Sequence, residues 1–330
     1  MIPQSEYQPS PPETGDAWRL TGMDCLSKSS LKSLRQRNNL SGLIYLGVHL
    51  SALSIAGLLV NVTIGSWWIV PSTLLYGSII VLLFAPMHEC SHFTAFRWRW
   101  LNYTVGMFAA VLTIRPFLYF KWRHAEHHTY AQHPTRDPDA VSMPQSFGQY
   151  VFLVLGAGFW HKMLGTLWRG CSGRFSQAEC DYIPRGELHK VSLEIRMMVS
   201  LYAVIALVSV ITGSWVAVTY WLLPRVLCEP VLRAIRMAEH TGAQESPNLL
   251  FNTRTTLANP VFRTLYWNMP FHAEHHIAAS VPFHALGRLH EEIKPHLGCI
   301  GEGYWQVHRQ IRRQIAVDKP DYGQHRGGKG

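Results

Sequence analysis

Two apolar runs and the motif after them decide the fold: LIYLGVHLSALSIAGLLVNV at residues 43–62, WWIVPSTLLYGSIIVLLFAP at 67–86 and HECSH at 88–92. Each run is almost free of charge and is long enough, as a helix, to cross the apolar layer of a bilayer. Only the four residues TIGS (63–66) join them, which leaves no room for a domain. The two runs are therefore predicted to form a transmembrane hairpin, and the histidine motif stands directly after it.

A second apolar hairpin is predicted later in the chain. MMVSLYAVIALVSVI at 197–211 reaches a Thr-Gly-Ser turn at 212–214, and WVAVTYWLLPRVLCEPVL at 215–232 runs back. Arg225 and Glu229 in its second half are expected near the membrane interface or facing the protein interior. The predicted fold class is therefore an all-α integral membrane protein with four transmembrane helices in two hairpins.

Two further apolar stretches are ambiguous. Residues 105–120 carry Arg115 followed by a proline, and residues 147–167 carry His161 and Lys162. Each stretch could cross the membrane or lie on its surface as an amphipathic helix, and the surface position is favoured. If only one of them crossed, the rest of the chain would change sides. Four spans are therefore the most economical topology.

Composition supports the membrane location. Hydrophobic residues make up 48% of the 330 residues and charged residues only 15%, against about 25% charged in an average soluble domain. The net charge of +9 lies in segments that flank the apolar runs, which favours an anionic membrane face over nucleic acid as the partner. Because the short hairpin loops contain no Lys or Arg, the positive-inside rule places the histidine motifs and both termini in the cytoplasm.

The two ends of the chain differ from the middle. Residues 1–40 begin with a Pro-rich stretch, continue with a basic one and show no cleavable signal peptide, and residues 311–330 form a basic tail. Both ends are predicted to be disordered, which leaves residues 41–310 as the membrane domain. The six cysteines show no CxxC pair or framework spacing, so we expect ordinary thiols in a reducing compartment.

Histidines recur at helical spacing beyond the apolar runs. HECSH places His88 and His92 four residues apart, and HAEHH occurs at both 124–128 and 272–276 with histidines at i, i+3 and i+4. These spacings put the imidazoles on one face of a helix, where they can converge on one ion. His240, in RMAEHTG, is a ninth candidate. Nine imidazoles are too many for one tetrahedral zinc and suit two metals with four or five nitrogens each.

Polar neighbours of these histidines are candidates to support them. Glu126 and Glu274, inside the two HAEHH motifs, lie on another helix face and are expected to support the site or to be solvated, not to ligate. His133, together with Asp137 and Asp139, is a candidate to hydrogen-bond a ligand imidazole and fix its tautomer.

Three clusters in the order HxxxH, HxxHH and HxxHH, the first just beyond a transmembrane hairpin, resemble the membrane fatty acid desaturase and hydroxylase superfamily. The stretches NMPFHAEHH (268–276) and VPFHALGRLH (281–290) look like a bacterial branch of it. The resemblance implies four spans with a cytoplasmic helical cap around a non-haem di-iron centre. It also implies the iron ligands, which are His88, His92, His124, His127, His128, His240, His272, His275 and His276.

Members of this superfamily use molecular oxygen and two external electrons to attack an unactivated C–H bond. The resemblance therefore implies two iron ions, oxygen as co-substrate and a fatty acyl or other lipid substrate. Because the sequence has neither a haem-binding HPGG nor a GxGxxG motif, the electrons are expected from a separate donor of the ferredoxin, rubredoxin or cytochrome b5 type with its reductase. A bacterial inner membrane is favoured over the endoplasmic reticulum.

Desaturation of a fatty acyl chain is the leading interpretation of these motifs. Hydroxylation, or oxidative decarboxylation of a free fatty acid to a terminal alkene, stays open on the same scaffold. The alternative from another class is a non-catalytic membrane metal transporter. Its ligands would be expected within the spans at bilayer depth, whereas the histidine clusters here lie beyond them.

One position departs from the superfamily pattern. In structurally known acyl-CoA desaturases, an asparagine four residues before the histidine that matches His240 reaches a metal through water, and here that position is Arg236. Because a guanidinium cannot ligate a metal, Arg236 is predicted to hold a substrate carboxylate or Glu239. Asn268, one helical turn before His272, is an alternative residue for holding the water.

Overall fold

A computed structural model describes residues 18–317, and the described chain is almost entirely helical. Residues 1–17 and 318–330 of the two predicted disordered ends lie outside the described residues. The part of the N-terminal arm that is described contains the short 3-10 helix η1 (Met23–Cys25) and α1 (Lys28–Leu34). The boundaries drawn from the sequence at residues 40 and 310 stay predictions.

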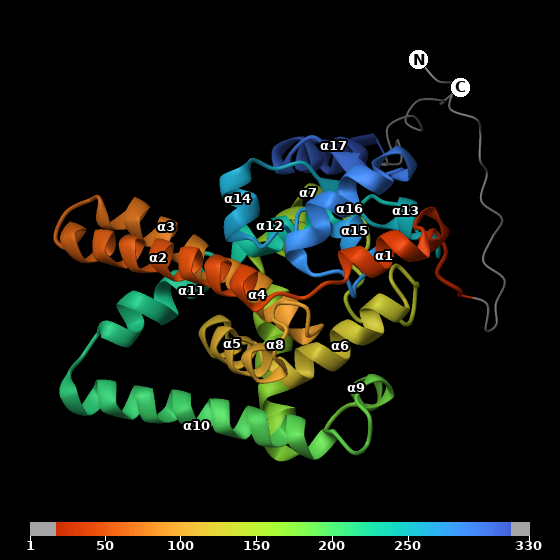
Figure 1. Cartoon of the computed structure of the whole chain (residues 1–330). Coiled ribbons are helices and arrows are strands. Elements are labelled where there is room, and N and C mark those ends of the chain that lie inside the picture. The colour runs from red at the N-terminus through yellow and green to blue at the C-terminus, as the bar shows by residue number, and fades with distance from the viewer. Residues whose placement is uncertain (1–17, 318–330) are drawn as a thin grey trace, which may run out of the picture.

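The first predicted hairpin is present as two long helices packed side by side (Figure 1). Helix α2 (Asn39–Thr63) begins at Asn38, whose side-chain oxygen accepts a hydrogen bond from the Leu40 amide at 2.8 Å. Helix α3 (Ile69–Leu82) continues almost directly into α4 (Phe84–Ser91), so the two form one rod, the α3–α4 rod. The first histidine motif thus ends the second helix of the hairpin.

Three helices of the described chain are long and apolar enough to cross a membrane, namely α2, the α3–α4 rod and α10 (Leu188–Thr212). The two stretches that the sequence left ambiguous are bent pairs, which raise the number to five if each is one span. One pair is α5 (Arg99–Thr113) with α6 (Phe117–Thr129), bent by 98°, and the other is α7 (Phe147–Leu155) with α8 (Ala157–Ser172), bent by 45°.

Local backbone chemistry explains both bends. Between α5 and α6, Ile114 adopts a left-handed conformation with φ of 55°, and Pro116 cannot donate a backbone hydrogen bond to continue α5. Between α7 and α8, Gly156 has φ of 76°, a conformation that glycine adopts at little cost.

The predicted partner of α10 is not one continuous helix. Residues beyond the Thr-Gly-Ser turn form a π-helix (Val218–Leu222), α11 (Leu223–Leu227) and α12 (Glu229–His240). Pro224 interrupts the hydrogen-bond ladder here because it lacks an amide donor. Helix α11 packs against α3 and α10 packs against α8, so the second predicted hairpin is splayed (Figure 1).

The remaining elements are short and build a cap at one end of the long helices. They are α9 (Gln177–Tyr182), α13 (Leu249–Asn252), β1 (Thr255–Thr256), α14 (Pro260–Leu265), α15 (His272–Ile277), η3 (Phe283–Ala285), α16 (Leu286–Ile293), η4 (Lys294–His296), β2 (Ile300–Gly301) and α17 (Tyr304–Val317). Strands β1 and β2 pair in parallel, with Thr255 opposite Ile300. The main hydrophobic core fills the space between the α3–α4 rod, α5, α6, α15 and α16.

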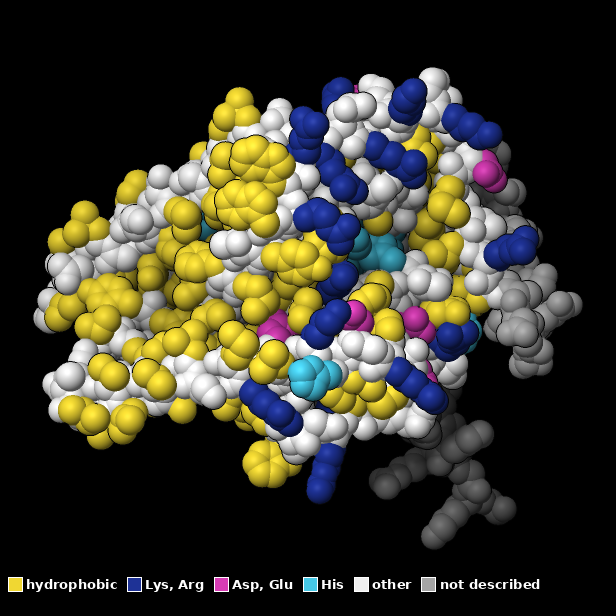
Figure 2. All heavy atoms as spheres, turned by 60° about the horizontal axis from the view of Figure 1, so that its bottom comes forward, with side chains coloured by type: hydrophobic (Ala, Val, Ile, Leu, Met, Phe, Trp, Pro, Cys, Tyr) yellow, Lys and Arg dark blue, Asp and Glu magenta, His cyan; other side chains and the backbone are white. Residues whose placement is uncertain are grey.

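The surface has two characters. Figure 2 shows hydrophobic side chains over the long helices on the left and Lys and Arg side chains over the cap on the right. On α10, Leu207 is 59% exposed and Val210 80%. Such a continuous apolar surface is stable in contact with lipid and not with water. The charged cap therefore belongs in the aqueous phase.

Candidate metal centre

All nine histidines that the sequence singles out meet where the cap packs against α4, α6 and α12, in two adjacent groups. The five-histidine group consists of His88, His92, His124, His128 and His275, and the four-histidine group of His127, His240, His272 and His276. Within each group, one ring nitrogen per residue lies within 4.8 Å of all the others. The rings of His128 and His276 join the groups, with centroids 4.2 Å apart.

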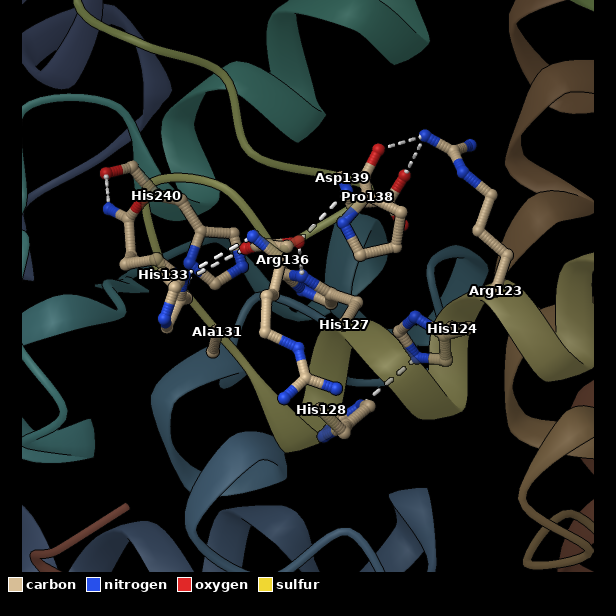
Figure 3. Close-up of polar contacts among 12 residues, drawn as sticks. Arg123, His124, His127, His128, Ala131, His133, Arg136, Pro138, Asp139 and His240 are labelled. Carbon is tan, nitrogen blue, oxygen red and sulfur yellow. Dashed lines mark hydrogen bonds and ion pairs between the residues drawn. The ribbon is translucent and has the colours of Figure 1, made fainter. Parts of the chain in front are cut away.

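Helical geometry explains how a few elements supply so many imidazoles. Successive residues of an α-helix point about 100° apart, so His127 and His128 on α6 reach different groups (Figure 3). Helix α15 divides in the same way, since His275 joins the five-histidine group and its neighbour His276 the other. His240 is the last residue of α12.

The ring nitrogens converge as the ligands of a metal ion do. The Nε2 atom of His128 lies 3.0 Å from Nε2 of both His124 and His275, and the Nε2 atoms of His272 and His240 lie 3.2 Å apart. Imidazole nitrogens bind a transition metal at about 2.1 Å, so two of them at right angles on one ion are about 3 Å apart. The donor set therefore fits metal ions.

Burial keeps these imidazoles in the neutral form that ligates metals. Removal from water lowers the pKa of His92 to about 4 and that of His240 to about 3. The pKa values of His275 and His276 lie well below their ordinary range for the same reason, with neighbouring histidines adding to the effect. A metal ion can therefore bind without displacing protons from these rings.

Asp137 supports the four-histidine group. Its Oδ1 atom accepts a hydrogen bond from Nδ1 of His127 at 2.8 Å, and its Oδ2 atom accepts one from the Gln132 amide at 2.8 Å. The proton of His127 is thereby placed on Nδ1, and Nε2, which is buried and has no hydrogen-bond partner, is left for a metal. His133 lies in the following turn instead, where its Nδ1 accepts from the amides of Thr135 and Arg136 at 3.2 Å. Of the three residues predicted to orient a ligand imidazole, Asp137 contacts His127 directly, and the role of His133 stays a prediction.

Arg236 lies beside the four-histidine group and holds Glu239. Its Nε atom is 3.4 Å from Oε2 of Glu239, and the same oxygen is 3.5 Å from Nε2 of His272. Asp139 lies 2.7 Å from Arg123 (Figure 3). It also lies 3.5 Å from Arg236. Burial alone would raise the pKa of the Asp139 carboxyl, but these two guanidinium groups outweigh it and hold that pKa well below its ordinary value.

Comparison with known proteins agrees with this geometry. Residues 65–308 match the family described as fatty acid desaturase. The chain belongs to the fatty acid desaturase family. An sn-1 oleoyl-lipid 12-desaturase of Synechocystis sp. is 25% identical over 280 residues, which cover 78% of each chain. The fatty acid conjugase FAC2 B of Calendula officinalis is 25% identical over 239 residues, covering 64% of this chain and 63% of its own.

Glu89 is a residue of this desaturase-family enzyme that spacing arguments missed. It is fully buried, and its Oε2 atom accepts hydrogen bonds from the Thr94 hydroxyl at 2.9 Å and the Phe283 amide at 3.3 Å. Its Oε1 atom lies 3.7 Å from Nδ1 of both His88 and His275. Glu89 therefore lies beside the Nδ1 atoms of two rings of the five-histidine group. Its position inside HECSH is the feature of the sequence that could have identified it.

Glu274 and Glu126 occupy the same position in the two HAEHH motifs but differ in surroundings. Glu274 is fully buried, where it binds Nδ1 of His290 and the Thr255 hydroxyl, each at 2.5 Å. It thus ties α15 to α16 and to β1. Glu126 lies 3.5 Å from the half-exposed guanidinium of Arg136 in a solvated pair. The partnership of His290 has no spacing signal in the sequence.

Asn268 is engaged outside the two groups. Its backbone is left-handed, with φ of 55°, and its side-chain amide donates to the Phe283 carbonyl at 3.2 Å. The same amide lies 3.5 Å from the Tyr45 hydroxyl. These contacts hold the turn before α15, and the water-holding role of Asn268 stays a prediction.

Proposed function

We propose that this enzyme uses molecular oxygen and a pair of iron ions to desaturate a fatty acyl chain, and that the nine histidines are the iron ligands. The single observation that carries the proposal is the meeting of nine buried imidazoles in adjacent groups of five and four. The desaturase and conjugase activities in the names of its relatives support a fatty acyl substrate.

The residues of the chain have definable tasks in this reaction. When bound, the iron pair would supply the redox chemistry for breaking a C–H bond, which zinc does not offer. Asp137 holds the tautomer of His127, and Glu89 and Glu274 hold the elements that carry the other rings. The buried core around α4, α6 and α15 excludes water from the site. Positioning of the substrate chain then selects the carbon that reacts.

The proposed topology has four spans, formed by α2, the α3–α4 rod, α10 and residues 215–232. The bent pairs then lie outside the apolar layer, and the cap and both termini lie in the cytoplasm of a bacterial cell. The loops at 63–66 and 212–214, which contain no Lys or Arg, support this orientation. Because the basic cap faces the cytoplasm, electrons would arrive there from a separate ferredoxin, rubredoxin or cytochrome b5 system.

Expression in a host with a simple lipid profile, followed by gas chromatography of the fatty acids, tests the proposal. We expect a new double bond that depends on oxygen and reductant, and about two irons per purified chain, as four or five imidazoles each imply. A hydroxylated chain or a terminal alkene would instead assign one of the alternative reactions. Stoichiometric zinc, without oxygen consumption in the presence of reductant, would contradict the proposal and favour a transporter.

A further inference from the structure

A cluster of arginines around one carboxylate lies beside the histidine groups. Arg225, Glu229 and Arg233 follow at four-residue spacing along α11 and α12, and Arg115 joins them from the α5–α6 bend. Oε1 of Glu229 lies 2.9 Å from Nη2 of Arg115 and 2.7 Å from Nε of Arg233, and Oε2 lies 2.6 Å from Nη1 of Arg225. Three guanidinium groups thus share one carboxylate.

The neighbouring ion pairs do not balance this charge. Arg236 and Arg123 are matched by Glu239 and Asp139, so the excess of two positive charges stays on the three arginines around Glu229. Arginine keeps its proton in proteins, and a buried charge without a partner is costly. The surroundings of Glu229 therefore favour the binding of an anion.

Unpartnered donors show where such an anion would be held. Arg225 is fully buried and its Nη2 atom has no hydrogen-bond partner, and the same is true of Nε of Arg115, which is 6% exposed. The ring of Phe159 covers the cluster, 4.0 Å from Cζ of Arg115 and 4.7 Å from Cζ of Arg233. The Arg233 side chain is 21% exposed, so the cluster is open at that edge.

The cluster also lies close to both histidine groups. The guanidinium carbons of Arg115 and Arg236 lie 5.4 and 4.9 Å from the ring of Phe84, and that ring lies 5.8 Å from the ring of His88. On the other side, Glu239 alone separates Arg236 from His272. An anion held here would be separated from His88 by the ring of Phe84.

We propose that Arg115, Arg225 and Arg233 bind the anionic head, a carboxylate or a phosphate, of the lipid that is oxidised. This inference rests on the proposed function because it concerns the substrate of that site. Guanidinium groups match the planar or tetrahedral oxygens of such heads. An anchored head also fixes the reacting carbon by its distance from the head. The position attacked is then constant when the chain is shortened at its methyl end.

The test measures binding without reductant, so that no turnover is needed. Oleate, oleyl phosphate and the neutral methyl oleate are titrated by calorimetry into the full-length, metal-loaded protein in neutral detergent. We expect at least one anion to bind about tenfold or more tightly than the ester, as expected for hydrogen bonds to a charged group. The preferred anion then identifies the head group. Equal binding of the ester and both anions would overturn the inference.

Two variants separate this site from general surface attraction. Arg233→Gln, at the open edge, is expected to lower affinity for the preferred anion about tenfold and to leave the ester unchanged, and Arg233→Lys is expected to recover part of the loss. Arg136→Gln removes the same charge from a solvated pair on the cap and is the matched control. An equal loss in Arg136→Gln, or no loss in a folded Arg233→Gln protein, would refute the assignment.

Product analysis gives a second measurement that does not depend on a variant folding. Saturated chains of different lengths are supplied to wild-type enzyme, and the modified carbon is located in each product. We expect one position when counted from the head, and a position constant from the methyl end would contradict the inference. Anion-selective binding in a protein that oxidises no lipid would refute the proposed function and leave the anion site standing.

Discussion

Helix α10 and the histidine cap distribute polarity in opposite ways. On α10, apolar side chains such as Val210 and Ile211 are 80% and 73% exposed. Around the two histidine groups, Glu89, Glu274 and His275 are fully buried. Each arrangement would be unstable in the surroundings of the other, because exposed apolar surface requires lipid and buried polar groups require partners. The comparison shows that the surface of α10 suits an apolar solvent outside the protein, whereas the histidine region has buried groups that could bind metal ions.

The largest effect on activity is expected when one of the nine converging imidazoles is removed. His124→Ala or His275→Ala is expected to reduce turnover to background and to release iron, because either change leaves the five-histidine group with four converging nitrogens. Product formation and iron content are measured on membrane-inserted protein. His189→Ala, at an exposed histidine outside both groups, is the control. Wild-type activity in either ligand variant would remove the case for the site.

A smaller effect is expected from a residue that only orients a ligand. Asp137→Asn keeps the shape of the side chain but weakens its hold on the His127 proton. We expect a loss of about 10- to 100-fold in metal affinity or activity, as is typical for such partners. Metal affinity is measured by competition with a chelator, and Arg136→Gln in the same loop serves as control. Unchanged affinity would show that the hydrogen bond has no effect on the metal.

The buried histidines also predict how stability depends on pH. In metal-free protein, the pKa values of His92, about 4, and His240, about 3, lie below the ordinary value of 6.5. As the pH falls below about 6.5, the unfolded chain therefore binds protons that the folded chain does not. Stability is expected to be full above pH 6.5 and to fall steadily toward pH 4. Denaturation midpoints of chelator-treated protein at pH 7.5 and 5.5 measure this, and equal midpoints would contradict it.

The smallest effect is expected on the lipid-facing surface. Leu289 is fully buried in the cap, whereas Leu207 on α10 is 59% exposed. Leu289→Ala is expected to cost about 2–5 kcal/mol of unfolding free energy because it leaves a cavity. Leu207→Ala is expected to change it by less than about 0.5 kcal/mol. Denaturation in lipid nanodiscs compares the two, and a large effect at Leu207 would mean that α10 packs against protein there.

The sequence predicts the histidine groups well because helical spacing is a local property. HxxHH places its rings on a helix face whatever the rest of the fold does, and all nine histidines meet accordingly. The interruption of the helix that follows α10 is harder to predict, because the sequence at 215–232 is a single apolar run. Packing of α11 on α3, together with Pro224, interrupts it.

Contacts between segments that are far apart in the chain could not be predicted from the sequence. The pairing of His290 with Glu274 and of Arg115 with Glu229 joins residues that are 16 and 114 positions apart. No periodic pattern connects such residues, because their approach depends on how the helices pack. The sequence therefore identified the histidines that converge, with Glu274, Asp137 and Arg236 as supporting candidates, but it did not give the partners of Glu274 and missed Glu89.

Two pairs of consecutive histidines, 127–128 on α6 and 275–276 on α15, each contribute one residue to each histidine group. Residues joined by one peptide bond cannot be displaced independently, so an ion that draws one ring into place also fixes the backbone of the next. The second ion then meets rings that have already lost much of their freedom. Metal loading is therefore expected to be cooperative, with chains holding a single ion scarce at half saturation.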